Sequence, residues 1–218
     1  YATPAVVQHV FALILALTIR LPDYQRAVSA GAWQRHDRFC LMDYPIRELA
    51  GRTLGIVGFG ELGQAVARVA EAFGMRILVA QRPGGPPREG RLPLDELLPQ
   101  VDVLSLHCPL TDATRGLIGA RELGLMRRDA LLINTARGGI VDEPALADAL
   151  RRGVIGGAGI DVLSREPPRA GNPLLAPDIP NLIVTPHTAW ASREARQRVV
   201  DEAVSYTHLR AHETEATI

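Results

Sequence analysis

The feature that most constrains this chain is a glycine-rich turn placed between an apolar run and an amphipathic stretch. Gly58-Phe59-Gly60-Glu61-Leu62-Gly63 directly follows the apolar run Thr53–Val57 and opens a helical pattern. In this context Gly58 permits a tight turn, Gly60 lets the backbone approach a pyrophosphate, and Gly63 allows close packing of helix on strand. The helix start at Glu61 and Leu62 presents free amides to an anion. The context favours a dinucleotide site over an ordinary strand-to-helix turn.

The rest of the chain continues the alternation of short apolar runs and helical stretches, which is typical of strand-helix-strand units. Six strands are expected, at Thr53–Val57, Met75–Ala80, Val101–His107, Ala130–Asn134, Ile155–Ile160 and Leu182–Thr185. Helices are expected at Pro4–Thr18, Leu62–Phe73, Leu94–Pro99, Gly119–Met126 and Glu143–Arg152. This order predicts an α/β fold with a doubly wound parallel sheet, a Rossmann-like dinucleotide-binding domain.

Composition excludes several other classes of protein. Lysine plus arginine equals aspartate plus glutamate at 24 each, so no net positive charge favours nucleic acid or an anionic membrane. The longest apolar run, Val10 to Ile19, is about half of a membrane span. The two cysteines, Cys40 and Cys108, lack the spacing of a zinc site or disulfide framework, so no metal is expected and the cytoplasm is the expected compartment.

The end of the second expected strand bears on the choice between NAD and NADP. A dinucleotide fingerprint of the NAD type has an acidic residue about 20 positions after the glycines, which binds the ribose 2′-hydroxyl. Here Gln81 and Arg82 stand at that point instead. An arginine can bind the 2′-phosphate of NADP, so NADP is favoured over NAD. The alternative is that Arg82 points into solvent.

Polar residues follow several other expected strands, at the edge of the sheet where ligands bind in such folds. Three of these residues supply what a 2-keto acid requires. Arg137 offers a planar cation for its carboxylate, His187 a proton donor for its carbonyl, and Glu166 a carboxylate that keeps the donor protonated. Taken singly, each has an alternative reading as a surface charge, a loop carboxylate or a structural histidine. Their convergence at successive strand ends favours catalysis.

Further residues at the same edge complete the predicted cofactor site. Asp161 is either a turn residue or the acceptor for the nicotinamide carboxamide, and the second reading is preferred. His107 and Cys108 are interpreted as structural. The remaining predicted cofactor contacts are Pro109, Thr114, Thr135, Ala136, His187 and Ala189.

Taken together, these motifs resemble the D-isomer-specific 2-hydroxyacid dehydrogenases over about residues 1–204. The resemblance rests on the glycine run, Phe73-Gly74-Met75, His107-Cys108-Pro109-Leu110-Thr111, Asn134-Thr135-Ala136-Arg137-Gly138, Asp161 with Glu166-Pro167, and Pro186-His187. Within the family the chain is most similar to the bacterial glycerate dehydrogenase or hydroxypyruvate reductase group. The resemblance implies interconversion of D-glycerate and hydroxypyruvate, with glyoxylate as an alternative substrate. It also implies substrate binding by Arg137, proton transfer by His187 with Glu166 as its partner, and homodimers.

The resemblance also predicts a division of the chain. Family members begin with a separate substrate domain, so residues 1–22 are expected to form the helix after a missing domain. Residues 23–50 are expected to form an arm crossing between subunits, or alternatively an intramolecular lid. Residues 51–204 are expected to form the dinucleotide-binding domain. Residues 205–218 do not resemble the family and are expected to be a non-native tail, in which the helical spacing of His208 and His212 carries no metal site.

Two other functional classes stay open at this level. A dinucleotide-responsive binding protein, similar to the C-terminal-binding transcriptional corepressors, would share the fold and even the polar residues. A fragment that binds dinucleotide without turnover is the third possibility. Fold alone does not separate these, because function resides in the site.

Overall fold

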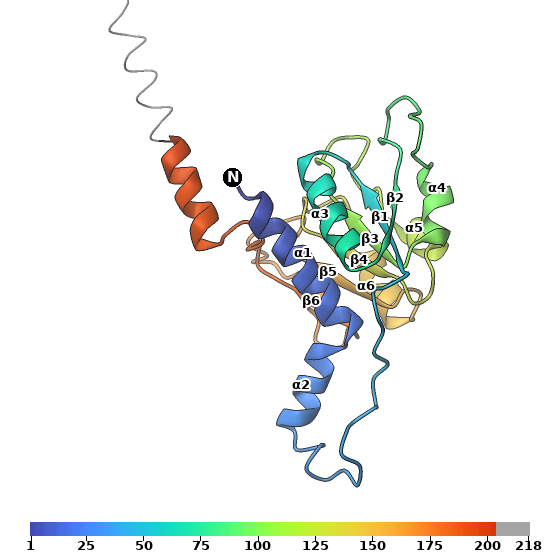
Figure 1. Ribbon diagram of the computed structural model, residues 1–218, viewed down its shortest axis with the longest axis vertical. Coiled ribbons are helices and arrows are strands. Elements are labelled where there is room, and N and C mark those ends of the chain that lie inside the picture. Colours follow the sequence, from blue (N-terminus) through green and yellow to red (C-terminus); the bar gives the residue numbers. More distant parts are fainter. Residues whose placement is uncertain (204–218) are drawn as a thin grey trace, which may run out of the picture.

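The computed structural model describes residues 1–203 and contains a six-stranded, fully parallel sheet (Figure 1). The strand order is β2-β1-β3-β4-β5-β6. The strands are β1 Thr53–Val57, β2 Arg76–Val79, β3 Val103–Leu106, β4 Leu131–Asn134, β5 Gly157–Ile160 and β6 Leu182–Val184. All six strands lie within the ranges expected from the sequence, and the α/β, doubly wound prediction is confirmed.

Helices cover both faces of this sheet. They are α1 Thr3–Thr18, α2 Leu21–Ser29, α3 Glu61–Ala72, α4 Leu94–Leu97, α5 Ala120–Leu125 and α6 Glu143–Arg151, with short 3₁₀ turns at Leu98–Gln100 and Pro173–Leu175. The helix expected over Leu94–Pro99 is therefore split into α4 and a 3₁₀ turn. Residues 193–203 are also helical.

Two hydrophobic cores result, one on each face. Helices α1 and α3 pack on one face against residues such as Leu54, Ile56 and Ile133. The other face carries α4, α5 and α6 against Leu104 and Leu132. Successive strand residues point to opposite faces, so strands buried on both sides read as continuous apolar runs. That is why the sequence located them well.

Residues 20–50 depart from the compact body. From the sequence the first helix was expected to end at Thr18, and no further helix was expected before Leu62. The first point is right, since α1 ends at Thr18, but Pro22 lies in the first turn of a second helix, α2. Arg20, with φ of 56°, turns the chain between them, and proline is well suited to a helix start.

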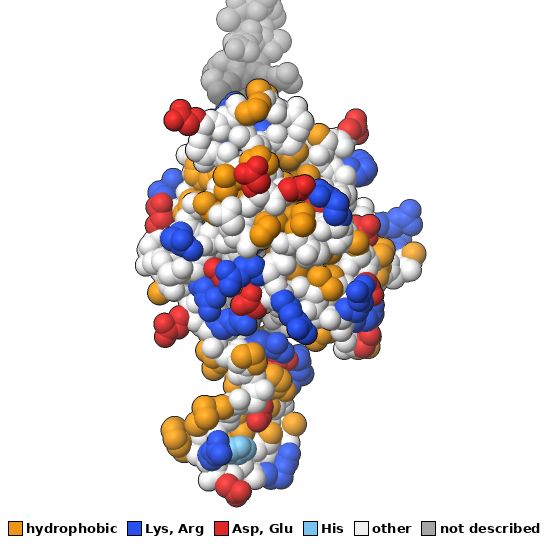
Figure 2. All heavy atoms as spheres, turned by 90° about the vertical axis from the view of Figure 1, so that its right-hand side faces the viewer, with side chains coloured by type: hydrophobic (Ala, Val, Ile, Leu, Met, Phe, Trp, Pro, Cys, Tyr) orange, Lys and Arg blue, Asp and Glu red, His pale blue; other side chains and the backbone are white. Residues whose placement is uncertain are grey.

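Figure 2 shows the projecting part as a lobe with apolar side chains on its surface, below a body on which acidic and basic side chains are interspersed. We call residues 20–50 the arm. No single helix within residues 1–203 is long and apolar enough to span a membrane, and only α1 and α2 taken together, bent by 60°, pass that test of length and composition. The tail 205–218, with His208 and His212, lies outside the described residues.

The sheet topology positions the site. β1 lies between β2 and β3, so the chain leaves β1 in one direction and returns on its other side, which opens a crevice beyond the ends of β1 and β3. The last paired residues of five neighbouring strands are Val57, Leu106, Asn134, Ile160 and Val184. The residues that follow form the next row across the sheet: Gly58, His107, Thr135, Asp161 and Thr185. We call this the edge row.

Candidate active site

The glycine turn has the shape that close approach of a ligand requires. Gly58 has φ of +96°, and a side-chain carbon there would lie 2.6 Å from the backbone nitrogen of Cys108. A side-chain carbon on Gly63 would lie 2.2 Å from the carbonyl oxygen of Gly58. At Gly60, the N-cap of α3, no atom lies within 4 Å of that position. The turn is therefore tight at both ends and open in the middle, in front of the helix start.

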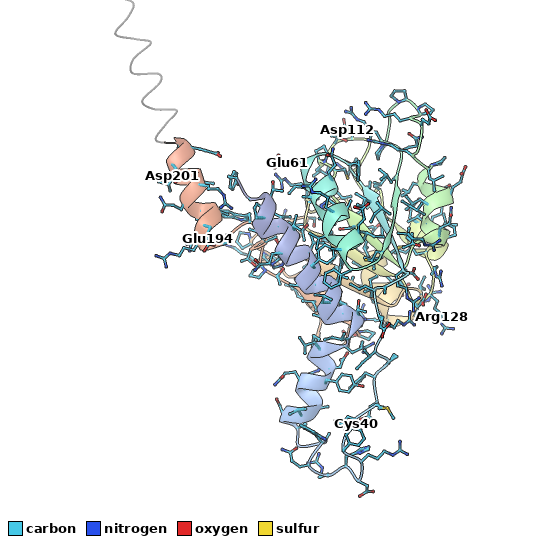
Figure 3. All side chains as sticks on the ribbon, in the orientation of Figure 1. Cys40, Glu61, Asp112, Arg128, Glu194 and Asp201 are labelled. Atoms are coloured by element: carbon cyan, nitrogen blue, oxygen red, sulfur yellow. The ribbon has the colours of Figure 1, made fainter. Side chains whose placement is uncertain are left out.

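A cleft of about 620 Å³ lies beside this opening, between the starts of α1 and α3 and the ends of the strands. Most of the predicted site residues line it: Gly60, Glu61, Leu62, Pro109, Thr135, Ala136, Arg137, Asp161, His187 and Ala189. Tyr1, Thr3, His107 and Trp190 line it as well. The side chain of Glu61 accepts a hydrogen bond from Thr3 Oγ1 at 2.6 Å, so its backbone amide is the group left to face a ligand (Figure 3).

Two buried polar atoms in this cleft lack a hydrogen-bond partner within residues 1–203: Nδ1 of His107 and Oγ1 of Thr135. They are neighbours in the edge row. Buried polar groups are nearly always paired, so two adjacent exceptions indicate where a polar ligand group completes the site. The glycine cradle and these two atoms fit a dinucleotide, whose anionic and hydroxyl-bearing parts match an open helix start and unpaired polar atoms.

His187 and Glu166 are brought together as the sequence predicted. His187 Nδ1 lies 2.6 Å from Glu166 Oε2, and Glu166 Oε1 accepts the backbone N–H of Leu163 at 2.8 Å. The histidine has φ of 55°, a left-handed conformation that is uncommon outside glycine and is often held at functional sites. Its backbone N–H is donated to the carbonyl oxygens of Asp161 and Thr185. With Nδ1 occupied by the carboxylate, Nε2 is the nitrogen available to a substrate.

Asp161 shapes the turn that carries His187. Its carboxylate accepts hydrogen bonds from the Thr185 hydroxyl and from the backbone amides of Thr188 and Ala189, at 3.0 and 2.9 Å for the amides. His9 of α1 reaches the same network, with Nε2 2.9 Å from Thr185 Oγ1. The turn role, one of the two readings left open by the sequence, is thus present. A carboxamide contact by Asp161 stays a prediction.

Arg137 is exposed at the rim of the cleft, on a loop held by Asn134, for which the sequence had suggested no role. The side chain of Asn134 is 1% exposed, accepts the N–H of Ala136 at 3.1 Å and donates to the carbonyl oxygen of Arg137 at 3.0 Å. Asn134 therefore closes the turn after β4. The sequence feature that could have predicted this role is a polar residue at the end of an otherwise apolar, buried strand.

Gln81 and Arg82, which follow β2, differ in how their side chains are used. The Gln81 amide accepts the N–H of Arg88 at 2.9 Å and donates to the carbonyl oxygens of Arg88 and Arg91, both at 3.1 Å. Its side chain therefore holds the loop 82–91, and a cofactor contact by Gln81 stays a prediction. Arg82 is exposed; its backbone carbonyl accepts the N–H of Gly85 at 2.9 Å, whereas its guanidinium makes no hydrogen bond or ion pair within residues 1–203.

Thr114 is not brought to the cleft. Its hydroxyl donates to the carbonyl oxygen of Pro109 and accepts the N–H of Thr111, both at 2.7 Å, and the residue is 4% exposed. The side chain closes its own loop, because a hydroxyl can bond nearby backbone groups. The side chain thus has a structural role next to Pro109, which lines the cleft, and the cofactor contact of Thr114 stays a prediction.

His107 is more than the structural residue expected from the sequence. Its Nε2 is 2.9 Å from Ser105 Oγ, two residues earlier on the same face of β3, and its Nδ1 is the unpaired atom described above. Burial lowers the pKa of His107 to about 4. The ring is therefore neutral at physiological pH and can take either hydrogen-bonding role toward a ligand. Within residues 1–203, no group of three or more histidine, cysteine or acidic side chains could hold a metal ion.

Fold and site together define a dinucleotide-binding domain in which a histidine lining the cleft contacts a carboxylate. The family model for the D-isomer specific 2-hydroxyacid dehydrogenase NAD binding domain matches residues 11–189. The chain belongs to this family.

Known relatives agree with this assignment. The chain is 50% identical over 204 residues to a glycerate dehydrogenase of Methylorubrum extorquens, covering 94% of this chain and 64% of that protein. A D-lactate dehydrogenase of Aquifex aeolicus, complexed with NAD and lactic acid, superposes with a TM-score of 0.82 at 34% identity, covering 98% of this chain and 68% of that one. An acyclic imino acid reductase in complex with NADPH and D-Arg gives 0.77 at 31% identity, covering 96% and 66%. The chain thus spans less than two thirds of the glycerate dehydrogenase.

Proposed function

We propose that this chain supplies the cofactor-binding and proton-transfer part of an enzyme that interconverts hydroxypyruvate and D-glycerate, with glyoxylate as an alternative substrate. The observation that carries the proposal is the 2.6 Å contact between His187 and Glu166 at the mouth of the glycine-turn cleft. The similarity to a glycerate dehydrogenase supports the choice of substrate.

The residues divide the work as follows. A nicotinamide cofactor held by the glycine turn and the cleft would supply the hydride for C2 of the keto acid. Arg137 binds the substrate carboxylate through its planar guanidinium. His187 Nε2 donates a proton to the carbonyl oxygen, which becomes the hydroxyl of the product. Glu166 accepts the Nδ1–H of His187, which fixes the ring orientation and stabilises the imidazolium.

The test combines binding and turnover, because the two fail independently. Fluorescence titration with NADPH and NADH reports on the glycine-turn cleft without any substrate. Reduction of hydroxypyruvate and glyoxylate reports on chemistry, and His187→Ala or Arg137→Ala is expected to lower it by about 10²- to 10⁴-fold. Arg152→Ala, an exposed residue on the far end of α6, is the matched control. Unchanged turnover in both cleft variants would contradict the assignment.

We further infer that NADPH is preferred to NADH. Arg82 is exposed beside the end of β2, and its guanidinium has no hydrogen-bond or ion-pair partner within residues 1–203. The residues there, Gln81 and Arg82, are not acidic. A free guanidinium suits a phosphate monoester, since it offers charge-assisted and bidentate hydrogen bonds. Arg82→Ala is expected to weaken NADPH binding about tenfold, or about 1.4 kcal/mol, and NADH binding much less. Equal effects on the two cofactors would remove the 2′-phosphate role.

We also propose that the arm joins two copies of the chain. It exposes Trp33, Phe39, Met42 and Ile46, of which Phe39 is 89% exposed. Exposed apolar groups gathered on one projecting segment are typical of an association surface. Sedimentation is expected to show a dimer, and Phe39→Ser with Met42→Ser is expected to shift it to monomer. A monomeric parent chain would support the alternative, an arm that covers its own subunit.

A further inference from the structure

We propose that Glu143 is a positioning residue that sets the orientation of Glu166 toward His187 through the loop of residues 162–172. The inference rests on the proposed roles of Glu166 and His187. Glu143 was seen in the sequence only as the first residue of a helix.

Glu143 is a buried carboxylate whose partners all belong to that loop. It is 7% exposed. Its Oε1 accepts the backbone N–H of Ser164 at 2.6 Å, while Oε2 accepts the Ser164 hydroxyl and the Nδ2 of Asn172, both at 2.7 Å. Hydrogen bonds to a carboxylate are among the stronger ones in proteins. The loop is therefore tied at two points, 21 and 29 residues along the chain from Glu143.

The tie lies next to the catalytic pair. Leu163 and Ser164 are consecutive, and each gives its backbone N–H to a different carboxylate: Leu163 to Glu166 Oε1 at 2.8 Å, and Ser164 to Glu143 Oε1. The other oxygen of Glu166 meets His187. Any rotation of the Leu163–Ser164 segment that releases Glu143 also moves the amide that aligns Glu166.

The loop that carries Arg137 rests on the same segment. A side-chain carbon on Gly138 would lie 1.9 Å from the carbonyl oxygen of Leu163 and 2.5 Å from the nitrogen of Ser164. The two backbones therefore pack directly against each other. Leu163–Ser164 lies between the substrate-binding loop and the proton-transfer pair, and Glu143 holds it from behind.

If Glu143 only stabilised the start of α6, its loss would lower stability without changing how Glu166 meets His187. The neighbouring residue Asp142 allows these two roles to be distinguished. Asp142 is the N-cap of α6, and its side chain accepts the N–H of Ala145 at 3.0 Å. Asp142 thus supports the same helix start without touching the loop. Asp142→Ala is the matched control for loss of stability alone.

The main variant is Glu143→Gln, which keeps the size of the side chain. If its oxygen stays on the Ser164 N–H, its NH₂ group faces the Nδ2 of Asn172, and if the amide is reversed the NH₂ faces the Ser164 N–H, so one donor pair clashes in either orientation. Asn172 cannot reverse its own amide without losing the bond from Leu174 N–H to its Oδ1. The double variant Glu143→Gln with Asn172→Asp restores a donor facing an acceptor. It is expected to rescue what the single variant loses.

The readout is the ring ¹⁵N spectrum of His187 in the whole chain, assigned by comparison with His187→Ala. It needs neither cofactor nor turnover. In the parent chain the signals are expected to show a proton on Nδ1, held by Glu166. Glu143→Gln is expected to shift them toward a mixture of ring forms, the double variant to restore them, and Asp142→Ala to leave them unchanged while lowering the melting temperature.

The proposal is overturned if Glu143→Gln lowers stability as Asp142→Ala does and leaves the His187 signals in place. If Glu143→Gln does not fold, Ser164→Ala decides the matter, because it removes only the hydroxyl contact to Glu143. It is expected to move the same signals in the same direction by a smaller amount, and no movement refutes the proposal. Failure of the proposed function would be seen separately, as unchanged turnover in His187→Ala.

Discussion

The two edges of the sheet are both rich in polar groups, but those at the amino edge are paired with one another, whereas some at the carboxyl edge are not. At the amino edge the charged side chains are paired: Arg52 with Asp102 at 3.2 Å, both directly before strands, and Arg47 of the arm with Asp129, which lies just before β4. At the carboxyl edge, atoms of His107 and Thr135 are buried without partners within residues 1–203. Folding alone accounts for a closed network. Unpaired buried atoms need a further reason, and a ligand supplies it.

The largest effect is expected where a methyl group is added to the carboxyl edge. Gly63→Ala places a carbon 2.2 Å from the carbonyl oxygen of Gly58, so backbone must shift. We expect it to lower the free energy of unfolding by about 3 kcal/mol, the upper end for overpacking, and to abolish dinucleotide binding. Denaturant unfolding and fluorescence titration measure the two effects.

Gly60→Ala is the matched control. No atom lies within 4 Å of the added carbon and the backbone there is extended, with φ of −82°. Stability should therefore be unchanged, whereas affinity for NADPH should fall by at least about tenfold. Full affinity in Gly60→Ala would mean that the dinucleotide does not bind in the open space beside Gly60. The difference between the two edges would then no longer indicate a ligand site.

A second effect follows from the buried ring of His107, whose pKa falls from 6.5 to about 4 in the folded chain. Between these values the unfolded chain binds more protons, so stability is complete above pH 6.5 and is lost as the pH falls toward 4. We expect His107 to account for a loss of about 2 kcal/mol between about pH 7.5 and 5.

Urea unfolding at several pH values measures this slope. His107→Gln should flatten it, and His36→Gln, on the exposed arm, should not. Saturating NADPH should also flatten it if the cofactor occupies Nδ1. A slope that persists in His107→Gln would assign the titration to another group.

The smallest effect is expected at the amino edge. Burial alone would raise the pKa of the Asp129 carboxyl, but the hydrogen bond and charge of Arg47, together with a backbone hydrogen bond and the charge of Arg127, outweigh burial and lower it. Both side chains are partly exposed, at 40% for Arg47 and 30% for Asp129. A double-mutant cycle with alanine at both positions should give a coupling of about 0.2–1 kcal/mol, decreasing with salt and with pH below 3.8. A coupling above that range would mean that the ion pairs of the amino edge also contribute large energies, which would weaken the contrast with the carboxyl edge.

The sequence located the four central strands because they are buried along their whole length and therefore read as continuous apolar runs. The edge strands β2 and β6 are only partly buried, but they also consist mainly of apolar residues. The site was placed because the strand ends converge. Helix α2 was missed because Pro22 reads equally as an ending and as a beginning. The hydrogen bonds that Gln81 and Thr114 make within their own loops were not predicted, for another reason. A side chain that bonds its own loop and one that faces a ligand have the same residue type, and only the fold distinguishes them.

Glu143 and His107 show the same limit from the opposite side. The partners of Glu143 lie 21 and 29 residues away, so no local pattern reveals that its carboxylate is buried. The unpaired nitrogen of His107 depends on what the neighbouring strand brings beside it. Sequence periodicity gives the face of an element, whereas the pairing of individual atoms is set by tertiary contacts.

The left-handed backbone at His187 has a consequence for how such a protein can diverge. Asparagine adopts φ values near 55° more readily than most residues, so His187→Asn keeps the turn while removing the proton donor. The glycine turn and the edge row do not depend on that imidazole. A single codon change can therefore turn an enzyme of this architecture into a sensor of dinucleotide, with the fold retained and the chemistry gone.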